Sequence, residues 1–334
     1  MGCTTYGDPV RKERAQITAT AAAEISDYER HNTLDSVDQQ YGLVVDLSPS
    51  TLWQVGFSGE YVDDYTFVSA LEESGIPAER SRRKRATVSP HAIVALDEKN
   101  SLQFDYSFTK TQYDLSAYSD YRTHGGSLGW YHRLSNERTR LIFSVGASRA
   151  DFDRTDHDVV QKTYRGLVGV EHEFTETLSA TFLAGARYTK SEFPRAGAVV
   201  EEEDTGMVLD GSLRWRFEER LTLSADVDRD IAQSIYGENM IRDRVRVGLG
   251  IRLTERLRGN LTAAYYRNKT EGFIQAEKRQ TYRLGPAVSW RLGEKWSLWG
   301  GYSYTWTENQ INNRSQERNR VYVQLAFDWP IVLD

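Results

Sequence analysis

The amino-acid sequence predicts an all-β protein, a transmembrane antiparallel up-and-down β-barrel of about sixteen strands in a bacterial outer membrane. Three observations predict it. Short polar turn clusters recur along the chain, the segments between them alternate apolar and polar residues, and a polar composition is combined with many aromatic residues. One hairpin is easily missed or added in such a pattern, so fourteen and eighteen strands stay open as alternatives.

The turn clusters divide the chain into hairpins. After a wider first gap they are separated by roughly 37–43 residues, which fits two strands of about ten residues and one longer connection. Propeller blades and solenoid units repeat at a similar period, but a blade needs four short strands where this sequence has two long ones. The barrel is also favoured over a soluble β-sandwich, because so long a simple meander rarely forms one. The clusters lie at residues 47–51, 97–101, 134–138, 174–178, 217–221, 253–257 and 292–296.

The alternation between the clusters is that of β-strands. Valine, leucine and isoleucine take the odd positions of residues 245–253 and arginine or glycine the even ones, and residues 321–328 alternate in the same way. A period of two places each set on one face of a strand, whereas a helix would scatter it. The expected strands lie at 15–29, 38–47, 52–65, 85–96, 102–116, 121–134, 139–153, 161–174, 178–192, 204–217, 221–232, 241–253, 257–271, 278–292, 296–309 and 317–330.

The composition agrees with a wall that has one lipid-facing and one wet face. The 334 residues are 39% hydrophobic and 27% charged, yet include 19 Tyr, 12 Phe and 8 Trp. No run approaches the ~18 apolar residues that a membrane helix needs, which excludes a helical membrane protein. The seven prolines suit uninterrupted strands. The formal net charge of −6 argues against a general nucleic-acid-binding protein.

One domain is expected, a barrel over residues 15–334 preceded by a periplasmic tail over residues 1–14. A secretory signal peptide is absent from this sequence, because the start lacks a basic and an apolar region, and it is expected to have been removed or lost to a misplaced start. Cys3 is the single cysteine, which excludes an intramolecular disulfide. Cys3 either carries lipid, as at the end of a lipoprotein signal, or is a passive residue.

The strand pattern predicts which side chains face lipid. An aromatic girdle at headgroup level is expected at the strand ends, from Trp53, Trp130, Trp215, Trp290, Trp296 and Trp329. The lipid face is expected to carry Trp53, Val55, Phe57, Leu128, Trp130, Val168, Val170, Phe182, Leu213, Trp215, Leu249, Leu261, Tyr265, Val288, Trp290 and Leu325.

The opposite face is expected to carry a track of charge along the lumen. Three alternating aspartates lie between groups of alternating arginines, so neighbouring strands would set carboxylates against guanidinium groups. The track either attracts anionic solute or polymer or is a salt-bridged wall with no transport role. Its expected members are Arg214, Arg216, Asp226, Asp228, Asp230, Arg242, Arg244, Arg246, Arg252, Arg258, Arg279, Arg283, Arg291, Arg318 and Arg320.

Other polar segments indicate less. The acidic loop 151–158 has the charge for Ca²⁺ but lacks the glycine and bidentate glutamate of an EF-hand, so a solvated loop is favoured. The connection 66–84 either folds inward as a plug, contacts lipopolysaccharide phosphates, or is solvated. The six histidines show no metal-ligand spacing, and neither a serine-hydrolase motif nor a haem-attachment motif is present. We therefore expect no catalytic residue, metal or cofactor, and no enzyme.

The chain from about residue 15 resembles outer-membrane proteins of the β-barrel porin 2 (BBP2) type. The resemblance lies in strand–turn units such as residues 126–135 (GSLGWYHRLS) and 284–292 (LGPAVSWRL), and in the ending 327–330 (FDWP). Many relatives end on an aromatic residue, whereas this chain continues through residues 331–334. The resemblance implies an outer-membrane barrel in a family associated with exopolysaccharide export, and similar barrels sheathe multihaem cytochromes.

The expected function is a channel in the outer membrane that passes hydrophilic, anionic solute or an exported polysaccharide. The alternative is a barrel that sheathes a multihaem cytochrome or another partner in an electron conduit, and an outer-membrane enzyme is a third, less favoured hypothesis. The expected partners are outer-membrane lipid and lipopolysaccharide, together with a periplasmic export or electron-transfer protein, and no nucleic acid.

Overall fold

A computed structural model describes residues 15–26, 35–66, 80–153, 158–195, 198–218, 220–233, 239–270 and 277–327. They form sixteen antiparallel strands in a single sheet, so the predicted all-β class and strand number are confirmed. No helix in this part of the chain is long and apolar enough to cross a membrane. The expected tail 1–14, and with it Cys3, lies outside the described residues.

The strands follow the turn pattern of the sequence closely. The largest difference is β10, which begins six residues earlier than expected, because its charged start still pairs with β9 as far as Ala198 and Arg195. The strands are β1 (Ala15–Ser26), β2 (Ser36–Leu47), β3 (Trp53–Tyr65), β4 (Arg82–Ala95), β5 (Asn100–Tyr113), β6 (Asp120–Arg133), β7 (Thr139–Asp153), β8 (Val159–Thr175), β9 (Leu178–Arg195), β10 (Ala198–Phe217), β11 (Leu221–Gln233), β12 (Asn239–Arg252), β13 (Leu257–Thr270), β14 (Glu277–Arg291), β15 (Trp296–Asn309) and β16 (Arg314–Phe327).

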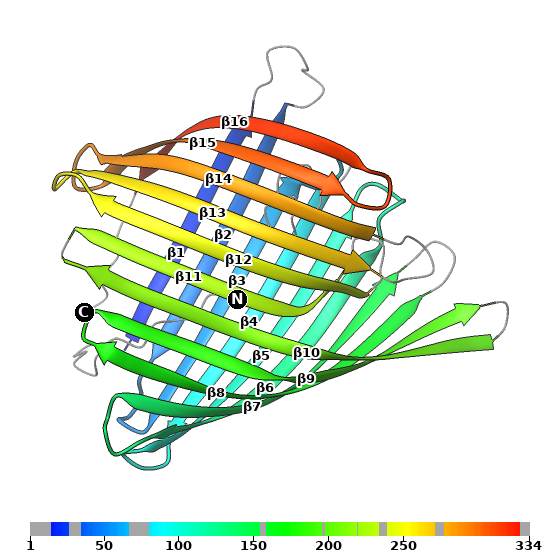
Figure 1. The fold of residues 1–334 in the computed structure, drawn as a ribbon, viewed down its shortest axis with the longest axis horizontal. Coiled ribbons are helices and arrows are strands. Elements are labelled where there is room, and N and C mark those ends of the chain that lie inside the picture. The colour runs from blue at the N-terminus through cyan, green and yellow to red at the C-terminus, as the bar shows by residue number, and fades with distance from the viewer. Residues whose placement is uncertain are drawn as a thin grey trace.

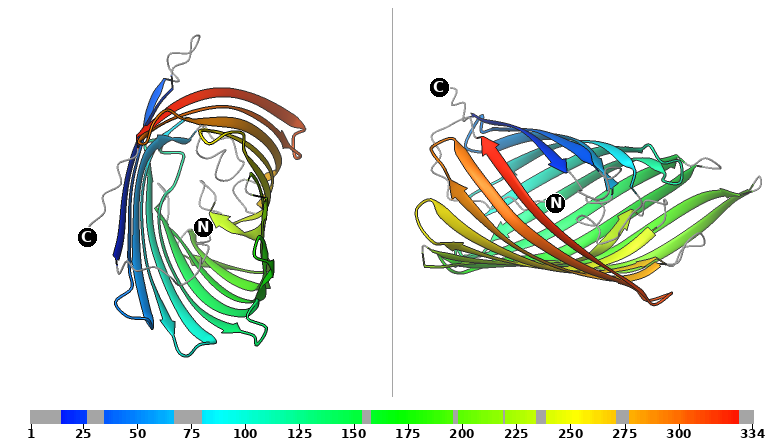
Figure 2. Two further views of the ribbon diagram at one scale, coloured as in Figure 1. Left: turned by 90° about the vertical axis from the view of Figure 1, so that its left-hand side faces the viewer. Right: turned by 90° about the horizontal axis from the view of Figure 1, so that it is seen from above.

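The sheet is a simple meander that curves into a nearly closed barrel. Each strand pairs with its neighbours in the chain, and β1 and β16 form the two edges. In Figure 1 the early strands lie behind the late ones, and the left view of Figure 2 shows the sheet curving round an interior. No pairing of β1 with β16 is recorded among the described residues. Outward side chains beside this seam are accordingly the most exposed of the large apolar ones, with Ile25 and Val321 both at 78%.

Side-chain acceptors at the start of the short turns explain their polar sequences. Asp97 Oδ1 accepts hydrogen bonds from the backbone N–H groups of Lys99 and Asn100, both at 2.8 Å. Asn136 and Thr254 accept from the amides two and three residues later in the same way. Such local bonds satisfy backbone donors that the strands leave unpaired at the turn.

The two faces of the sheet follow from the register. Directly paired residues of antiparallel strands face the same side, so one face can be traced through neighbours such as Leu102, Trp130, Phe143 and Val168. This face is apolar and exposed, as a lipid-facing wall requires. All residues of the expected lipid face lie on it.

The described inner face is largely polar and carries a small packed apolar cluster at one rim. Ala150, Phe152 and Val159 are buried where β7 and β8 meet the connection opposite the short turns, and Tyr121 and Phe193 pack against them. The rings of Tyr121 and Phe152 are 5.4 Å apart. Other buried apolar side chains, such as Ile142 and Met240, are scattered among the polar and charged residues of the inner wall.

Candidate functional site: the charged inner wall

The inner wall is most highly charged where β11 and β12 pair. Asp226, Asp228 and Asp230 lie directly opposite Arg246, Arg244 and Arg242, so the expected arrangement of carboxylates against guanidinium groups is present in the register. Arg244 Nε donates a hydrogen bond to Asp228 Oδ1, and Arg242 Nη2 lies 3.8 Å from Asp228 Oδ2. Asp228 is therefore shared by two arginines.

The other two aspartates turn towards different strands. Asp226 lies 3.9 Å from Arg214 on β10. Asp230 lies 3.6 Å from Arg165 on β8, although two strands separate β8 from β11 in the sheet. The curvature of the wall brings these two side chains together. Arg246, which faces Asp226 in the register, has no recorded side-chain partner among the described residues.

Arginine supplies the charge of the described inward side chains from β12 to β16. Among the described side chains of these strands, none that faces inward is aspartate or glutamate. Arg283 Nε donates a hydrogen bond to Ser303 Oγ at 3.1 Å, and the other arginines line the strands along their length. The inward arginines are Arg242, Arg244, Arg246, Arg252, Arg258, Arg279, Arg283, Arg291, Arg314, Arg318 and Arg320.

The wall formed by β2–β5 has the opposite sign and lies across the interior from β12–β14 (Figure 2, left). Its inward arginines, Arg83 and Arg85, are paired with its own carboxylates: Arg83 with Asp64 at 2.7 Å and Arg85 with Glu60 at 3.6 Å. Three further carboxylates face inward there, so the interior has a basic side and an acidic side. These are Asp38, Asp46 and Asp105.

The aromatic residues form an outward belt near the short turns. Trp53, Trp130, Trp215, Trp290 and Trp296 all face outward, and several stack on neighbours, such as Trp130 on Phe143 at 5.3 Å. Trp329 lies outside the described residues. Towards the other end of the strands a second outward group forms, in which Tyr265 lies 4.9 Å from Tyr282.

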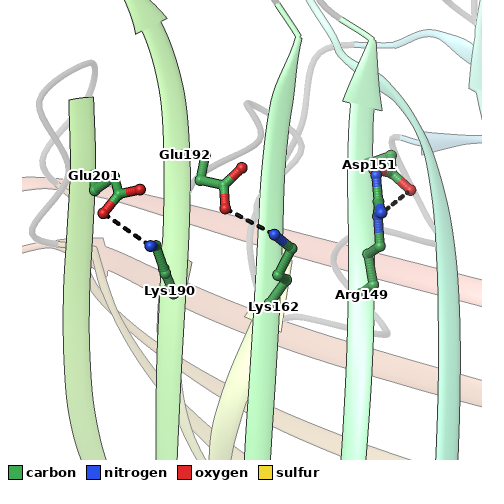
Figure 3. Close-up of polar contacts among 6 residues, drawn as sticks. All are labelled: Arg149, Asp151, Lys162, Lys190, Glu192 and Glu201. Atoms are coloured by element: carbon green, nitrogen blue, oxygen red, sulfur yellow. Dashed lines mark hydrogen bonds and ion pairs between the residues drawn. The ribbon is translucent and has the colours of Figure 1, made fainter. Parts of the chain in front are cut away.

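The outer face also carries a polar band that sequence reasoning did not single out. Just beyond the paired tyrosines Tyr164 and Tyr188, the strands β7–β10 carry three ion pairs (Figure 3). Their parity, which matches that of the lipid-facing residues, was the available signal. The pairs are Arg149–Asp151 at 2.7 Å, Lys162–Glu192 at 2.8 Å and Lys190–Glu201 at 2.8 Å.

The described residues hold no group of three or more histidine, cysteine, aspartate or glutamate side chains that could bind a metal ion. Three histidines interact with side chains of a neighbouring strand: His124 with Tyr106, His132 with Asn100 and His172 with Thr139. His91 on β4 lies 3.6 Å from Asp46, two strands away on β2. The centre of the candidate Ca²⁺ loop, residues 154–157, and most of the candidate plug, residues 67–79, lie outside the described part of the chain.

Solved outer-membrane proteins share this fold. The alcaligin outer membrane receptor FauA from Bordetella pertussis is 13% identical, with a TM-score of 0.54 over 97% of this chain and 62% of that chain. The copper transporter OprC is 12% identical, with a TM-score of 0.52 over 90% and 58%. The FrpB iron transporter from Neisseria meningitidis is 10% identical, with a TM-score of 0.51 over 82% and 53%. The chain thus spans less than two thirds of each, and the likeness shows the fold alone.

A comparison with curated protein sequences finds no match to this chain. The sequence model of the family described as Putative beta-barrel porin 2, in contrast, matches residues 144–328, from the middle of β7 to the end of β16. The matched segment is more than half of the chain. It includes the whole inner wall of β12–β16 with its inward arginines, here called the arginine wall. The chain therefore belongs to the family described as Putative beta-barrel porin 2 and is an outer-membrane β-barrel protein.

Proposed function

We propose that this protein is a channel that passes hydrophilic, anionic solute or an exported polysaccharide across the outer membrane. The observation that carries the proposal is the inner wall of β12–β16, whose described inward charges are all arginine. A wall of one sign inside a pore raises the local concentration of ions of the other sign and sets selectivity.

The same observation suits a noncovalent mechanism. Guanidinium groups stay charged at every physiological pH and bind carboxylate or phosphate oxygens through two parallel hydrogen bonds. A solute would pass from one arginine to the next along the wall, with the width of the lumen and its charge as the filters. No side chain of the chain is proposed to react with the solute.

The orientation follows from the turns. In bacterial outer-membrane barrels the short turns are periplasmic and the longer connections extracellular. The short turns here are 48–52, 96–99, 134–138, 176–177, 218–220, 253–256 and 292–295, and the longest connections, 27–35 and 66–81, lie at the other end. We therefore place the belt of Trp53, Trp130 and Trp290 at the periplasmic side of the membrane.

The first test is the conductance of the purified full chain in a planar bilayer, with reversal potentials measured under a salt gradient. We expect a steady conductance with anion preference. The triple variant Arg244→Gln, Arg246→Gln, Arg283→Gln should lower that preference. The matched control is Arg122→Gln, Arg149→Gln, Arg229→Gln, which removes the same charge from the outer face and should leave selectivity unchanged. Equal effects of the two variants would contradict the proposal.

A conductance too small to measure would favour the alternative function, a sheath around a multihaem cytochrome or another electron-transfer or export partner. The arginine wall would then be a docking surface for an acidic protein. Co-purification with a periplasmic haem protein, lost in the Arg244, Arg246, Arg283 variant, would support the sheath and overturn the channel.

We also propose that the outer polar band contacts lipopolysaccharide. Arg149, Lys162 and Lys190 lie one step beyond Tyr164 and Tyr188, at the level where an aromatic belt meets lipid headgroups. Phosphates of lipid A would compete there with the carboxylates in Figure 3 for the three cations. Replacement of all three by glutamine should reduce the lipopolysaccharide that co-purifies with the barrel. The control is the variant Arg229→Gln, Arg267→Gln, Lys278→Gln, which removes the same charge from the outer face of β11, β13 and β14. If the effect is local to the band, this control should leave the amount of lipopolysaccharide unchanged.

A further inference from the structure

Ion pairing along the arginine wall changes with distance from the short turns. Far from these turns the inward arginines of β8–β12 are engaged by carboxylates, as Arg187 is by Asp204 at 2.7 Å and Arg244 by Asp228, with Arg246 near the middle of β12 as the exception. Close to the short turns the pairing stops on β10 and β12–β14. No side-chain partner is recorded among the described residues for four inward arginines there, and all four are exposed: Arg216, Arg252, Arg258 and Arg291.

The register brings these four side chains into one patch. Arg252 on β12 lies directly opposite Arg258 on β13. Arg258 in turn lies opposite Ser289 on β14, and Arg291 is the next inward residue of that strand. Residues in such positions have Cβ atoms about 5 Å apart when directly opposite and about 7 Å apart on the diagonal.

Arg216 completes the patch from the other side. It pairs with Thr222 on β11, and Thr222 pairs with Gly250, the inward residue before Arg252. At about 4.8 Å between neighbouring strands, Arg216 is about 10 Å from β12. The patch is therefore about as wide as a short charged oligomer and is open to the lumen.

Nothing in the described wall balances this charge. Like charges directly opposite each other destabilise an antiparallel pair, and Arg252 and Arg258 are such a pair. The inward neighbours are small and uncharged, among them Ser224, Gly248 and Ser289. The glutamates of the adjacent turns, Glu218, Glu255 and Glu294, form no recorded ion pair with the four arginines. An arrangement of this kind is stabilised when an anion occupies it.

We propose that Arg216, Arg252, Arg258 and Arg291, the arginine patch, form a binding site for a multivalent anion at the short-turn mouth of the barrel. The ligand would present two or more carboxylate or phosphate groups, each held by a guanidinium through paired hydrogen bonds. Its place at the start of a transport path, facing the periplasm, rests on the proposed function. The site would then capture anionic material before it moves along the rest of the arginine wall.

Binding can be tested without an open pore. Fluorescently labelled trigalacturonate and labelled tripolyphosphate, as the carboxylate and phosphate probes, are titrated into the full chain folded in detergent, and anisotropy is measured. We expect the variant Arg252→Gln, Arg258→Gln, Arg291→Gln to bind at least one probe about tenfold more weakly or worse than the unmodified chain. The charge-matched control Arg122→Gln, Arg229→Gln, Arg267→Gln, on the outer face, should keep the affinity of the site.

Each outcome decides the proposal. Loss of carboxylate binding alone would assign a carboxylated carbohydrate or acid, and loss of phosphate binding alone a phosphorylated solute. No binding of either probe, or equal weakening in both variants, would overturn the site. Heat-dependent gel mobility, which differs between folded and unfolded barrels, checks that the patch variant folds. Conservative replacement of the same three arginines by lysine should restore part of the affinity, because the charge returns without the planar pair of donors.

A second measurement separates the site from the channel. In a planar bilayer with barrels inserted in one orientation, unlabelled trigalacturonate is added to each side in turn, and interruptions of the small-ion current are counted. Interruption at lower concentration from the short-turn side, lost in the patch variant, supports a capture site. If the current is interrupted equally from both sides and the pore keeps its anion selectivity, the site is overturned and the channel stands. If the probe binds the chain in detergent but no current is measured, the channel is overturned and the site stands.

Discussion

Arg83 donates two parallel hydrogen bonds to Asp64, from Nε to Oδ1 at 2.9 Å and from Nη2 to Oδ2 at 2.7 Å. The side chains are only 5% and 10% exposed, so this is one of the most buried ion pairs of the wall. Next to it, on the outer face, Arg82 makes the same two bonds to Asp63, but the Arg82 side chain is 41% exposed. Both carboxylates are buried, Asp63 at 11%, so the two adjacent pairs differ in how far the arginine is exposed to water.

This difference predicts unequal effects of two matched substitutions. Arg83→Gln would leave Asp64 charged and buried, and should lower the free energy of unfolding by about 3–5 kcal/mol. Arg82→Gln exposes Asp63 to water in place of the lost guanidinium and should cost about 1 kcal/mol or less. Urea unfolding in lipid vesicles, followed by tryptophan fluorescence, measures both. Equal losses would contradict the assignment of Arg83 to the buried side.

The assignment of faces predicts a large difference between two neighbouring residues of β8. Val168 faces outward near the middle of the strand and Leu167 faces inward. Val168→Arg would place a charge in the hydrocarbon layer and should lower the free energy of unfolding by about 2–4 kcal/mol. Leu167→Arg would extend into the polar lumen and should change it much less. The same unfolding assay measures both variants. A greater loss of unfolding free energy for Leu167→Arg than for Val168→Arg would mean that the outward and inward faces are assigned the wrong way round.

Asp228 predicts a change in selectivity. The Asp228 carboxylate partly neutralises the positive charge of Arg242 and Arg244. Asp228→Asn should therefore raise the anion preference of the pore. Asp243 lies one strand away, on the outer face, 3.5 Å from Arg229. Asp243→Asn therefore removes the same charge outside the lumen and should leave the reversal potential unchanged. A shift of similar size in both variants would show that the effect does not act through the lumen.

The turn at Asp97 predicts a dependence of stability on pH. Hydrogen bonds from the Asn100 side chain, and then from the Lys99 amide, lower the pKa of the Asp97 carboxyl. The stabilisation is fully present above the ordinary aspartate pKa, about 3.9, and is lost as the pH falls through the lower pKa of the folded state. The difference in stability between the unmodified chain and Asp97→Ala should therefore narrow below about pH 4.

The control for this turn is Asp97→Asn. The asparagine side chain can still accept the backbone hydrogen bonds of the turn but does not titrate. Its stability relative to Asp97→Ala should consequently stay constant between pH 3 and pH 7, as measured by heat-dependent gel mobility. A difference that narrows in acid for Asp97→Asn as well would place the titrating group elsewhere.

The local sequence pattern was sufficient to predict much of the fold but little of the candidate site. The strand positions and the outward residues, such as Val168 and Trp290, follow from a period of two that needs no partner to be recognised. The inward parity of Asp228 and Arg244 follows from the same period. The length of β10 does not, because the charged residues at its start lack an apolar alternation and are held by pairing with β9.

The pairing of charges lay beyond sequence pattern. Parity places Asp230 opposite Arg242, yet its closest recorded arginine is Arg165, three strands away around the wall. Which cation a carboxylate reaches depends on side-chain length and on the curvature of the sheet, and both act across strands that no local pattern connects. Parity alone could have placed the charged residues of Figure 3 on the outer face, but their pairing and the unpaired arginine patch could be recognised only from the contacts between strands.

The sequence by itself determined that the chain is an antiparallel barrel of about sixteen strands, with an apolar outside and an arginine-rich inside, because alternation and turn chemistry are local. The tertiary structure decided which arginines are neutralised, which remain unpaired near the short turns, and how β1 and β16 form the edges of a nearly closed sheet. The physical reason is that charge balance and closure depend on distances between strands, and these arise only when the whole sheet curves.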